Sequence, residues 1–462
     1  MDLPSIQLAP PIARFTIKGL HGYKDVSIEF AGKATIIVAE NGVGKTTILN
    51  TLNAFISRRF QRLNAIDFTS IECTFFGEIE PLILKKTQLD PTSKNNVTII
   101  EEFCSRWELD EADVRDFIYD INLDDFSSSR SHPVFIQLYN TSPLTMDSVQ
   151  NEFKELHARI FATLEDSTIS TLDKIREKMR DVKILYLPTY RRVEKPLLRP
   201  TRKPHRQRSA DHFNNDIAYG LADVELRLAE LSEEIERRSN FEYRSLSTRM
   251  LDELLQGGEN ENRISKQDLP DIESLSRFLN RVGRRQVGHQ VFEEIERLYD
   301  NNEIESSRNS FLRYFLSRLK RVIDQTREME LKVERFVDVC NSYLMISSDE
   351  KLLSFDPQTL RVVVLDSWTK KSIPLDELSS GEKQIVSLMA HLYLSEGRRV
   401  VLMDEPELSL SLPWQRKVLP DIINSGSVIQ LLAITHSPFI FENELDHCAI
   451  PLSITRAGTQ EC

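Results

Sequence analysis

The chain lacks the features of membrane and secreted proteins. It contains no apolar run of about 18 residues, and its first residues carry neither a basic segment nor a long apolar stretch. Its five cysteines are odd in number and include no C-x-x-C pair, which argues against a disulfide framework or a zinc site. These absences predict a cytoplasmic protein that does not contact a membrane.

Positive charge is also scarce over most of the chain. The formal net charge is −12 over 462 residues, of which 28% are charged and 40% hydrophobic. The exception is the segment 191–208, with six Arg and two Lys against one Glu. Any contact with DNA is therefore expected to be local to this segment. The same segment can equally be a solvated loop or can dock on an acidic surface.

One short loop carries the clearest chemistry. Residues 39–47 read AENGVGKTT, which matches the phosphate-binding pattern G-x-x-x-x-G-K-[ST] except that alanine replaces the first glycine. A β-branched run at 34–39 precedes the loop, and apolar residues at helical spacing follow from Ile48. Strand, glycine-containing loop and helix are the context that such a loop needs. If Ala39 needed a positive φ, nucleotide binding would weaken by about 1 kcal/mol.

The loop predicts a site for ATP and Mg²⁺. Backbone N–H groups at the start of a helix can surround phosphate oxygens. Lys45 is expected to contact the β- and γ-phosphates, and the Thr46 hydroxyl to bind Mg²⁺. The predicted nucleotide-binding residues of this loop are Asn41, Gly42, Val43, Gly44, Lys45, Thr46 and Thr47.

A second anion-binding motif lies far along the chain. LSSGEKQ at 378–384 leads into an apolar-faced helix. A small turn at a helix start exposes amides that suit an anion, so Ser379, Ser380 and Gly381 are further candidates for nucleotide binding.

Two strands then deliver acidic and imidazole side chains. RRVVLMDEPE (398–407) ends in Asp404, expected to hold Mg²⁺, and Glu405, expected to position or deprotonate the attacking water. LLAITHSPF (431–439) delivers His436, which can contact the γ-phosphate. The predicted catalytic residues are therefore Glu405 and His436.

In this order, the motifs resemble the ABC-type ATPase family, with its Walker A, signature, Walker B, D-loop (407–413) and switch-histidine segments. Within the signature, Ser380 and Glu382 depart from the commonest glycine and glutamine, although glutamate is frequent in the SMC-like branch. The resemblance implies a head-to-tail pair of subunits, in which the signature of one caps the γ-phosphate held by the other. A lone active monomer is not expected.

The predicted fold is α/β, an ABC-type ATPase head with a mixed sheet, split by a helical insertion. The expected parts are 1–220 and 345–462 for the head, and 221–344 for a short antiparallel coiled-coil arm. Two series of apolar residues at heptad spacing, one on each side of a loop, favour the arm. They are Leu221, Val224, Leu228, Leu231 and Ile235, and then Phe315, Leu319, Val322, Thr326, Met329, Val333, Phe336 and Cys340. The first series alone fits ordinary amphipathic helices packed on a core nearly as well.

Within the first part, strands and helices are expected to alternate. The stretch 14–30 predicts two strands joined by a turn, and 71–103 predicts further strands, including VTIIEEF at 97–103. A helix is expected over 147–179, followed by a strand at 183–188.

The spacing of the motifs favours one branch of the family. From Thr46 to Leu378 there are 332 residues, far more than a transporter subunit would place there. A head split by a long heptad-bearing insertion resembles the SMC, RecN, RecF and OLD-like branch. Only 26 residues follow His436, without an acidic cluster, so no nuclease site of its own is expected.

Two segments resemble one particular family within this branch. YLPTYRRVE (186–194) and DELSSGEKQIVSL (376–388) resemble the ATPase subunit of Septu-type antiphage defence systems, including those attached to retrons. That resemblance implies a dimer or a higher even-numbered complex whose nucleotide state gates a small HNH nuclease. The alternatives are a RecF- or SMC-like repair ATPase that binds DNA through 191–208, and an ATP-sensing scaffold of negligible turnover.

Overall fold

The computed structural model describes residues 10–40, 42–89, 93–121, 130, 132–161, 166–188, 221–255, 264–282, 285–346, 351–357 and 359–456. Two compact units contain them: Met1–Ala218 together with Glu396–Cys462, and Tyr219–Ser395. Asn41 and the basic segment 191–208 lie outside the described residues. The predicted division at 220 and 344 stays a prediction.

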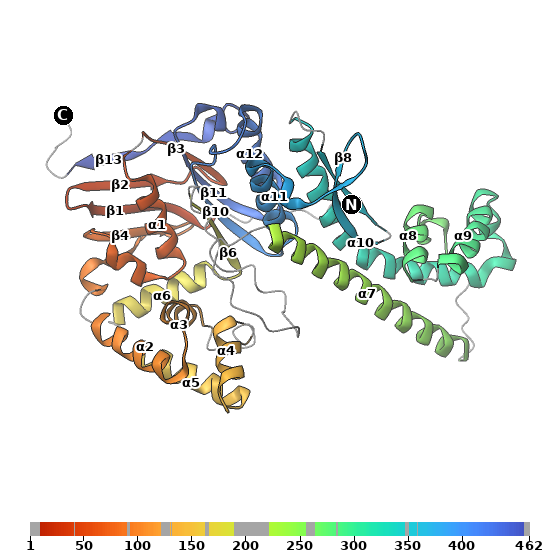
Figure 1. Ribbon diagram of the computed structural model, residues 1–462, viewed down its shortest axis with the longest axis horizontal. Coiled ribbons are helices and arrows are strands. Elements are labelled where there is room, and N and C mark those ends of the chain that lie inside the picture. The colour runs from red at the N-terminus through yellow and green to blue at the C-terminus, as the bar shows by residue number, and fades with distance from the viewer. Residues whose placement is uncertain are drawn as a thin grey trace. The chain divides into compact units, whose positions relative to one another are not determined.

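A parallel sheet forms the centre of the first unit (Figure 1). Every neighbouring pair in it is parallel, so the carboxyl ends of its strands lie at one edge. Its strands are buried, apolar and rich in Val and Ile, as expected for a sheet covered on both faces. In spatial order they are β12 (Ala449–Pro451), β3 (Ala34–Val38), β11 (Val428–Thr435), β10 (Arg398–Asp404) and β6 (Val182–Leu187).

An antiparallel sheet shares the hydrophobic core of this unit. In spatial order its strands are β13 (Ser453–Arg456), β2 (Lys24–Glu29), β1 (Ile12–Leu20), β4 (Ser70–Phe75) and β5 (Leu82–Lys85). Helix α1 (Lys45–Ile56) belongs to the same core, where Phe55 contacts Phe15 of β1. Gln430 of β11, fully buried, exchanges two hydrogen bonds with the backbone of Ile12. That exchange joins the two sheets. Helix α12 (Leu412–Asn424) contacts β11.

Four helices of the first unit pack around a separate core. They are α2 (Ser93–Trp107), α3 (Glu111–Asp120), α4 (Pro133–Thr141) and α5 (Met146–Phe161), and α6 (Asp166–Lys178) follows them. The strand predicted at 97–103 is wrong, because this stretch lies in α2. Ile100, Phe103 and Cys104 are buried at spacings of three and four, so one helical face packs on α3 and α5. That packing outweighs the strand preference of the β-branched residues.

The second unit contains two long helices, α7 (Leu221–Leu255) and α10 (Ser310–Leu344), labelled in Figure 1. All five residues of the first heptad series are buried, and so are all members of the second except Phe315, which is partly buried. Ile235 packs with Met329, whereas Leu246 packs in the cluster of Leu316. Residues later in α7 therefore pack against residues earlier in α10, so the two helices are antiparallel, as predicted.

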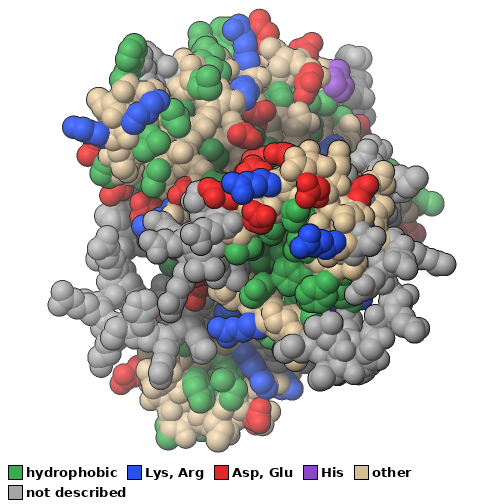
Figure 2. Space-filling model, turned by 90° about the vertical axis from the view of Figure 1, so that its right-hand side faces the viewer, with side chains coloured by type: hydrophobic (Ala, Val, Ile, Leu, Met, Phe, Trp, Pro, Cys, Tyr) green, Lys and Arg blue, Asp and Glu red, His purple; other side chains and the backbone are tan. Residues whose placement is uncertain are grey.

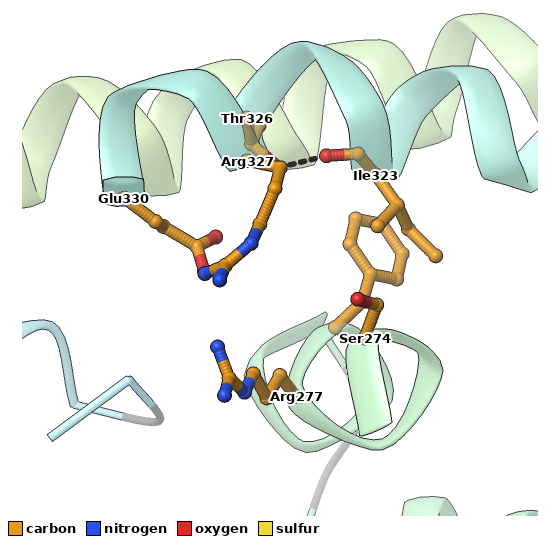
Figure 3. A pocket seen from close by; sticks show the side chains of 7 residues that line it. Ser274, Arg277, Ile323, Thr326, Arg327 and Glu330 are labelled. Atoms are coloured by element: carbon orange, nitrogen blue, oxygen red, sulfur yellow. Dashed lines mark hydrogen bonds and ion pairs between the residues drawn. The ribbon is translucent and has the colours of Figure 1, made fainter. Parts of the chain in front are cut away.

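Two shorter helices, α8 (Ile272–Val282) and α9 (Arg285–Asp300), follow α7 and share its apolar cluster with α10. Ion pairs also join α8 to α10. Arg277 of α8 lies 3.1 Å from Glu334 of α10, and Arg327 binds both oxygens of that carboxylate at 2.6 and 2.8 Å. Figure 3 shows Arg277 reaching from α8 towards Arg327 and Glu330. With three carboxylates around two guanidinium groups, this small pocket is not suited to an anion.

The second unit ends in a small antiparallel sheet and a helix. The sheet contains β7 (Lys351–Asp356), β8 (Arg361–Asp366) and β9 (Ser372–Ile373), and the helix is α11 (Ser380–Tyr393). The Asn341 side chain of α10 exchanges two hydrogen bonds with the backbone of Leu353, which anchors β7 to the long helix. Among the helices described in both units, none is long and apolar enough to cross a bilayer.

Candidate functional site

Three neighbouring strands of the parallel sheet end at the candidate site. The order β3–β11–β10 places the phosphate-binding loop after β3, His436 after β11, and Asp404 and Glu405 at the end of β10. Because all three strands run in the same direction, motifs as far apart in sequence as Thr46 and Asp404, separated by 358 residues, meet at one sheet edge. The structure therefore brings Lys45, Thr46, Asp404, Glu405 and His436 together.

The loop between β3 and α1 relies on glycine at two positions. Gly42 has φ 86° and Gly44, the residue before α1, has φ 97°. A Cβ at either position would meet no atom within 4 Å, so the left-handed backbone rather than space requires glycine. Val43 is half-buried between them, and Thr47 lies in the first turn of α1, where its carbonyl accepts from Thr51.

Ala39, at the first position of the loop pattern, is not among the residues with a positive φ. It is buried, and its N–H donates to the Thr435 carbonyl at 3.1 Å, which continues the β3–β11 pairing. The penalty expected for a left-handed alanine therefore does not arise.

Thr46 and Asp404 form an oxygen-rich pair. The Thr46 hydroxyl, in the first turn of α1, donates to the Asp404 carboxylate at the end of β10. Asp404 is nearly fully buried. A hydroxyl oxygen beside a carboxylate is the hard donor set that Mg²⁺ prefers, so these residues fit the predicted metal.

Lys45 and Glu405 face each other next to this pair. The Lys45 ammonium lies 3.0 Å from the Glu405 carboxylate, and the lysine is only 6% exposed. Glu405 has φ 52°, although its N–H still donates to the Ile434 carbonyl of β11. A bulky residue in the left-handed region is strained, and such strain concentrates at functional positions. Here it turns the carboxylate at the end of β10 towards Lys45.

His436 is held by a residue that the sequence reasoning did not select. Its Nδ1 lies 2.9 Å from the Glu407 carboxylate and 3.7 Å from that of Glu405. Glu407 also accepts the His436 backbone N–H at 3.1 Å and is 5% exposed. Gln415 supports this arrangement, since it donates to the Glu407 carbonyl and accepts from the Ser437 hydroxyl. The sequence DEPE shows a second glutamate three residues after Asp404, but its spacing does not reveal the contact with His436.

The remaining predicted residues, Ser379, Ser380 and Gly381, lie in the second unit. Ser379 caps α11, and its hydroxyl and the side chain of Glu382 form a reciprocal capping box. Ser380 and Gly381 begin the helix, and Ser380 is exposed. The turn thus has the amide geometry of an anion-binding helix start.

These features define a nucleotide-binding P-loop protein of mixed α/β fold with a helical insertion, as the sequence predicted. The family model for the AAA ATPase domain matches residues 11–441, and the chain belongs to that family.

Solved structures of Smc heads are similar to the chain at low identity. One is the Smc head domain with an extended coiled coil bound to the C-terminal domain of ScpA from Pyrococcus furiosus. The two chains are 13% identical, with a TM-score of 0.36, and the match covers 97% of this chain and 96% of the Smc chain. Another is the SmcHead bound to the C-winged helix domain of ScpA, with 11% identity, a TM-score of 0.34, and coverage of 97% and 98%.

Proposed function

We propose that the chain hydrolyses ATP with Mg²⁺ at the carboxyl edge of its parallel sheet. The observation that carries this proposal is the convergence of three contacts at that edge. They join Thr46 to Asp404, Lys45 to Glu405, and His436 to Glu407. A metal-ligand pair, a buried cation and an acid–imidazole pair are the groups that phosphoryl transfer to water needs.

Binding is assigned to the loop and to the end of β10. ATP with Mg²⁺, when bound, supplies a phosphoanhydride whose negative charge the metal offsets. Gly42 and Gly44 allow the loop backbone to turn its N–H groups towards phosphate oxygens, and Lys45 holds the terminal phosphates. Thr46 and Asp404 hold the metal through oxygen atoms.

Glu405 is assigned the role of general base. A bound phosphate would compete with Glu405 for the Lys45 ammonium and so weaken the contact between Lys45 and Glu405. The carboxylate can then accept a proton from the attacking water. Glu407 holds the imidazole of His436 through Nδ1, which leaves Nε2 as the nitrogen that can contact a phosphate.

We further propose that two copies pair head to tail when ATP is bound. The support is the turn at the start of α11, where Ser379 and Ser380 are exposed, together with the resemblance to ABC-type ATPases. In such a pair the turn of each copy caps the nucleotide held by the other copy.

We also propose that this ATPase regulates a small HNH nuclease in bacterial antiphage defence. The support is the resemblance of 186–194 and 376–388 to the Septu-type ATPase subunit. The test is to purify tagged Glu405→Gln protein from its native cell with ATP present, and to identify the proteins and nucleic acids that accompany it. Lys45→Ala, which should not hold ATP, is the matched control.

An HNH-type protein in fixed ratio with Glu405→Gln, and reduced with Lys45→Ala, would support the defence role. DNA or repair factors without a nuclease would instead support the RecF-like alternative, with 191–208 as the contact. A homodimer without companions would favour the ATP-sensing scaffold.

A further inference from the structure

The turn at the start of α11 is held by a buried carboxylate. Glu382 is 1% exposed, and its Oε2 accepts the backbone N–H of Ser379 at 2.7 Å. The Ser379 hydroxyl in turn accepts the N–H of Glu382 at 3.3 Å. The capping box therefore fixes Ser379 and uses the N–H of Glu382. The N–H groups of Ser380 and Gly381, the first two of the helix, are left for a ligand.

One cation from another element balances this carboxylate. The ammonium of Lys351, the first residue of β7, lies 3.3 Å from Glu382 Oε2 and 3.4 Å from the Glu377 carbonyl, to which it donates. Within the described part of the chain, Glu382 Oε1 has no hydrogen-bond partner. Lys351 is therefore the main electrostatic support of a charge that is almost completely removed from water.

Lys351 is itself fixed in place. It is the first residue of β7, whose Leu353 is bonded through both N–H and C=O to the side chain of Asn341 on α10. β7 also pairs along its whole length with β8. The ammonium thus approaches Glu382 from an anchored strand rather than from a loop.

We propose that Lys351 and Glu382 form a positioning pair. The pair holds the turn at the start of α11 in the conformation that binds the ATP of a second copy. The proposal rests on the head-to-tail pairing proposed above. Neither residue touches the nucleotide. Glu382 acts through the backbone of Ser379, and Lys351 acts by holding the buried Glu382 carboxylate against that backbone.

The chemistry predicts a specific pattern of variants. Lys351→Met leaves a buried carboxylate without its cation, which is strongly unfavourable, so the contact between Glu382 and Ser379 is expected to be lost. Glu382→Gln keeps an oxygen acceptor for the Ser379 N–H and needs no cation. Glu382→Gln is therefore expected to restore pairing in the Lys351→Met background, whereas Glu382→Ala is not, because it lacks the acceptor.

The experiment measures ATP-dependent dimerisation by light scattering in the Glu405→Gln background, with binding of a fluorescent ATP analogue to dilute monomer as a second readout. Lys351→Met is expected to weaken dimerisation about tenfold or more, which corresponds to about 1.4 kcal/mol. Analogue binding should stay unchanged, because the loop and β10 belong to the other unit. Lys351→Arg should pair as the parent does. Lys320→Met is the matched control, since Lys320 also donates to a backbone carbonyl in the same unit.

Dimerisation of Lys351→Met at the parental affinity would overturn the proposal. So would a loss of dimerisation that Glu382→Gln does not repair. If Lys351→Met does not fold, two double variants are compared, Lys351→Met with Glu382→Gln and Lys351→Met with Glu382→Ala. Neither of them buries a charge. Equal dimerisation of the two would overturn the proposal. If the Glu405→Gln parent itself stays monomeric with ATP, the head-to-tail pairing fails instead.

Discussion

Ala39 donates its N–H to Thr435 and has no positive φ, so the first position of the loop does not need glycine. We predict that Ala39→Gly leaves ATP affinity within about twofold and lowers the free energy of unfolding by about 0.5 to 1 kcal/mol, because glycine adds freedom to the unfolded chain. Isothermal titration with ATP and urea denaturation measure the two quantities.

Gly44→Ala is the matched comparison for this loop. Gly44 has a φ of 97°, which is costly for alanine, so we expect the variant to have a lower ATP affinity and a lower free energy of unfolding. A clear gain in ATP affinity for Ala39→Gly would show that the alanine does weaken the site.

Glu407 lies outside the predicted set but holds His436 through both the ring and the backbone. We predict that Glu407→Gln lowers kcat about tenfold and leaves KM for ATP unchanged, because a neutral amide oxygen is a weaker acceptor than a carboxylate oxygen and holds the imidazole less firmly. Steady-state ATPase kinetics provide the measurement. Glu442→Gln, an exposed carboxylate paired with Arg416, is the control. An unchanged kcat for Glu407→Gln would remove Glu407 from the mechanism.

The sequence could indicate most of this site because its residue types sit inside short, ordered motifs. Lys45 and Thr46 follow from the loop pattern, and Asp404 and Glu405 follow from an apolar strand that ends in carboxylates. Glu407 could not be selected in the same way. Its role depends on a contact between the turn after β10 and the end of β11, and no spacing within either segment reveals that contact.

At the scale of elements, the arm of α7 and α10 was predicted because two series of apolar residues with the same heptad period stand on either side of a loop. Helix α2, by contrast, was missed. Val97, Thr98, Ile99 and Ile100 are four consecutive β-branched residues, which locally favour a strand. Only the later Phe103 and Cys104 complete a helical face, and that face gains its stability from α3 and α5.

The helical cluster of the first unit contains a buried histidine on α5. Burial, and secondarily the charge of Arg176, lower the pKa of His157 from the usual 6.5 to about 4. The folded state therefore keeps this imidazole neutral at a pH where the unfolded chain protonates it. Because the unfolded state binds more protons between pH 6.5 and 4, the contribution of His157 to stability falls as the pH falls through this window.

We predict that the wild-type protein loses stability as the pH falls from 6.5 to 4, with each pKa unit contributing about 1.4 kcal/mol. His157→Phe should have a flatter profile, because it keeps a buried ring that takes up no proton. Urea denaturation at several pH values measures the slope, with the exposed His447→Phe as the control. Identical slopes for wild type and His157→Phe would assign the acid sensitivity to other groups.

At the scale of the whole molecule, charge argues against a broad nucleic-acid surface. The net charge is −12, and Figure 2 shows basic and acidic side chains interspersed on the face that it presents. A protein that tracks a phosphate backbone needs a continuous basic surface. The described residues on this face do not form one, so this face gives no support for DNA contact beyond the segment 191–208.

The proposed pairing makes one prediction that no single-chain mechanism shares. In a head-to-tail dimer each site combines the loop of one copy with the α11 turn of the other. Lys45→Ala destroys the loop side, and Ser380→Arg, at an exposed position of the turn, blocks the capping side. Each variant alone should be inactive. A mixed dimer contains one site in which both faulty parts meet and another in which both parts are intact.

Equal mixing of these two variants should therefore restore ATP hydrolysis. Random exchange makes about half of the dimers mixed, and each mixed dimer has one working site of two, so about a quarter of wild-type activity is expected. Steady-state ATPase assays across a range of mixing ratios measure this, and activity should peak at equal amounts. If the nucleotide were held and hydrolysed within one copy, no ratio would exceed the activity of the separate variants, and the α11 turn would need another role.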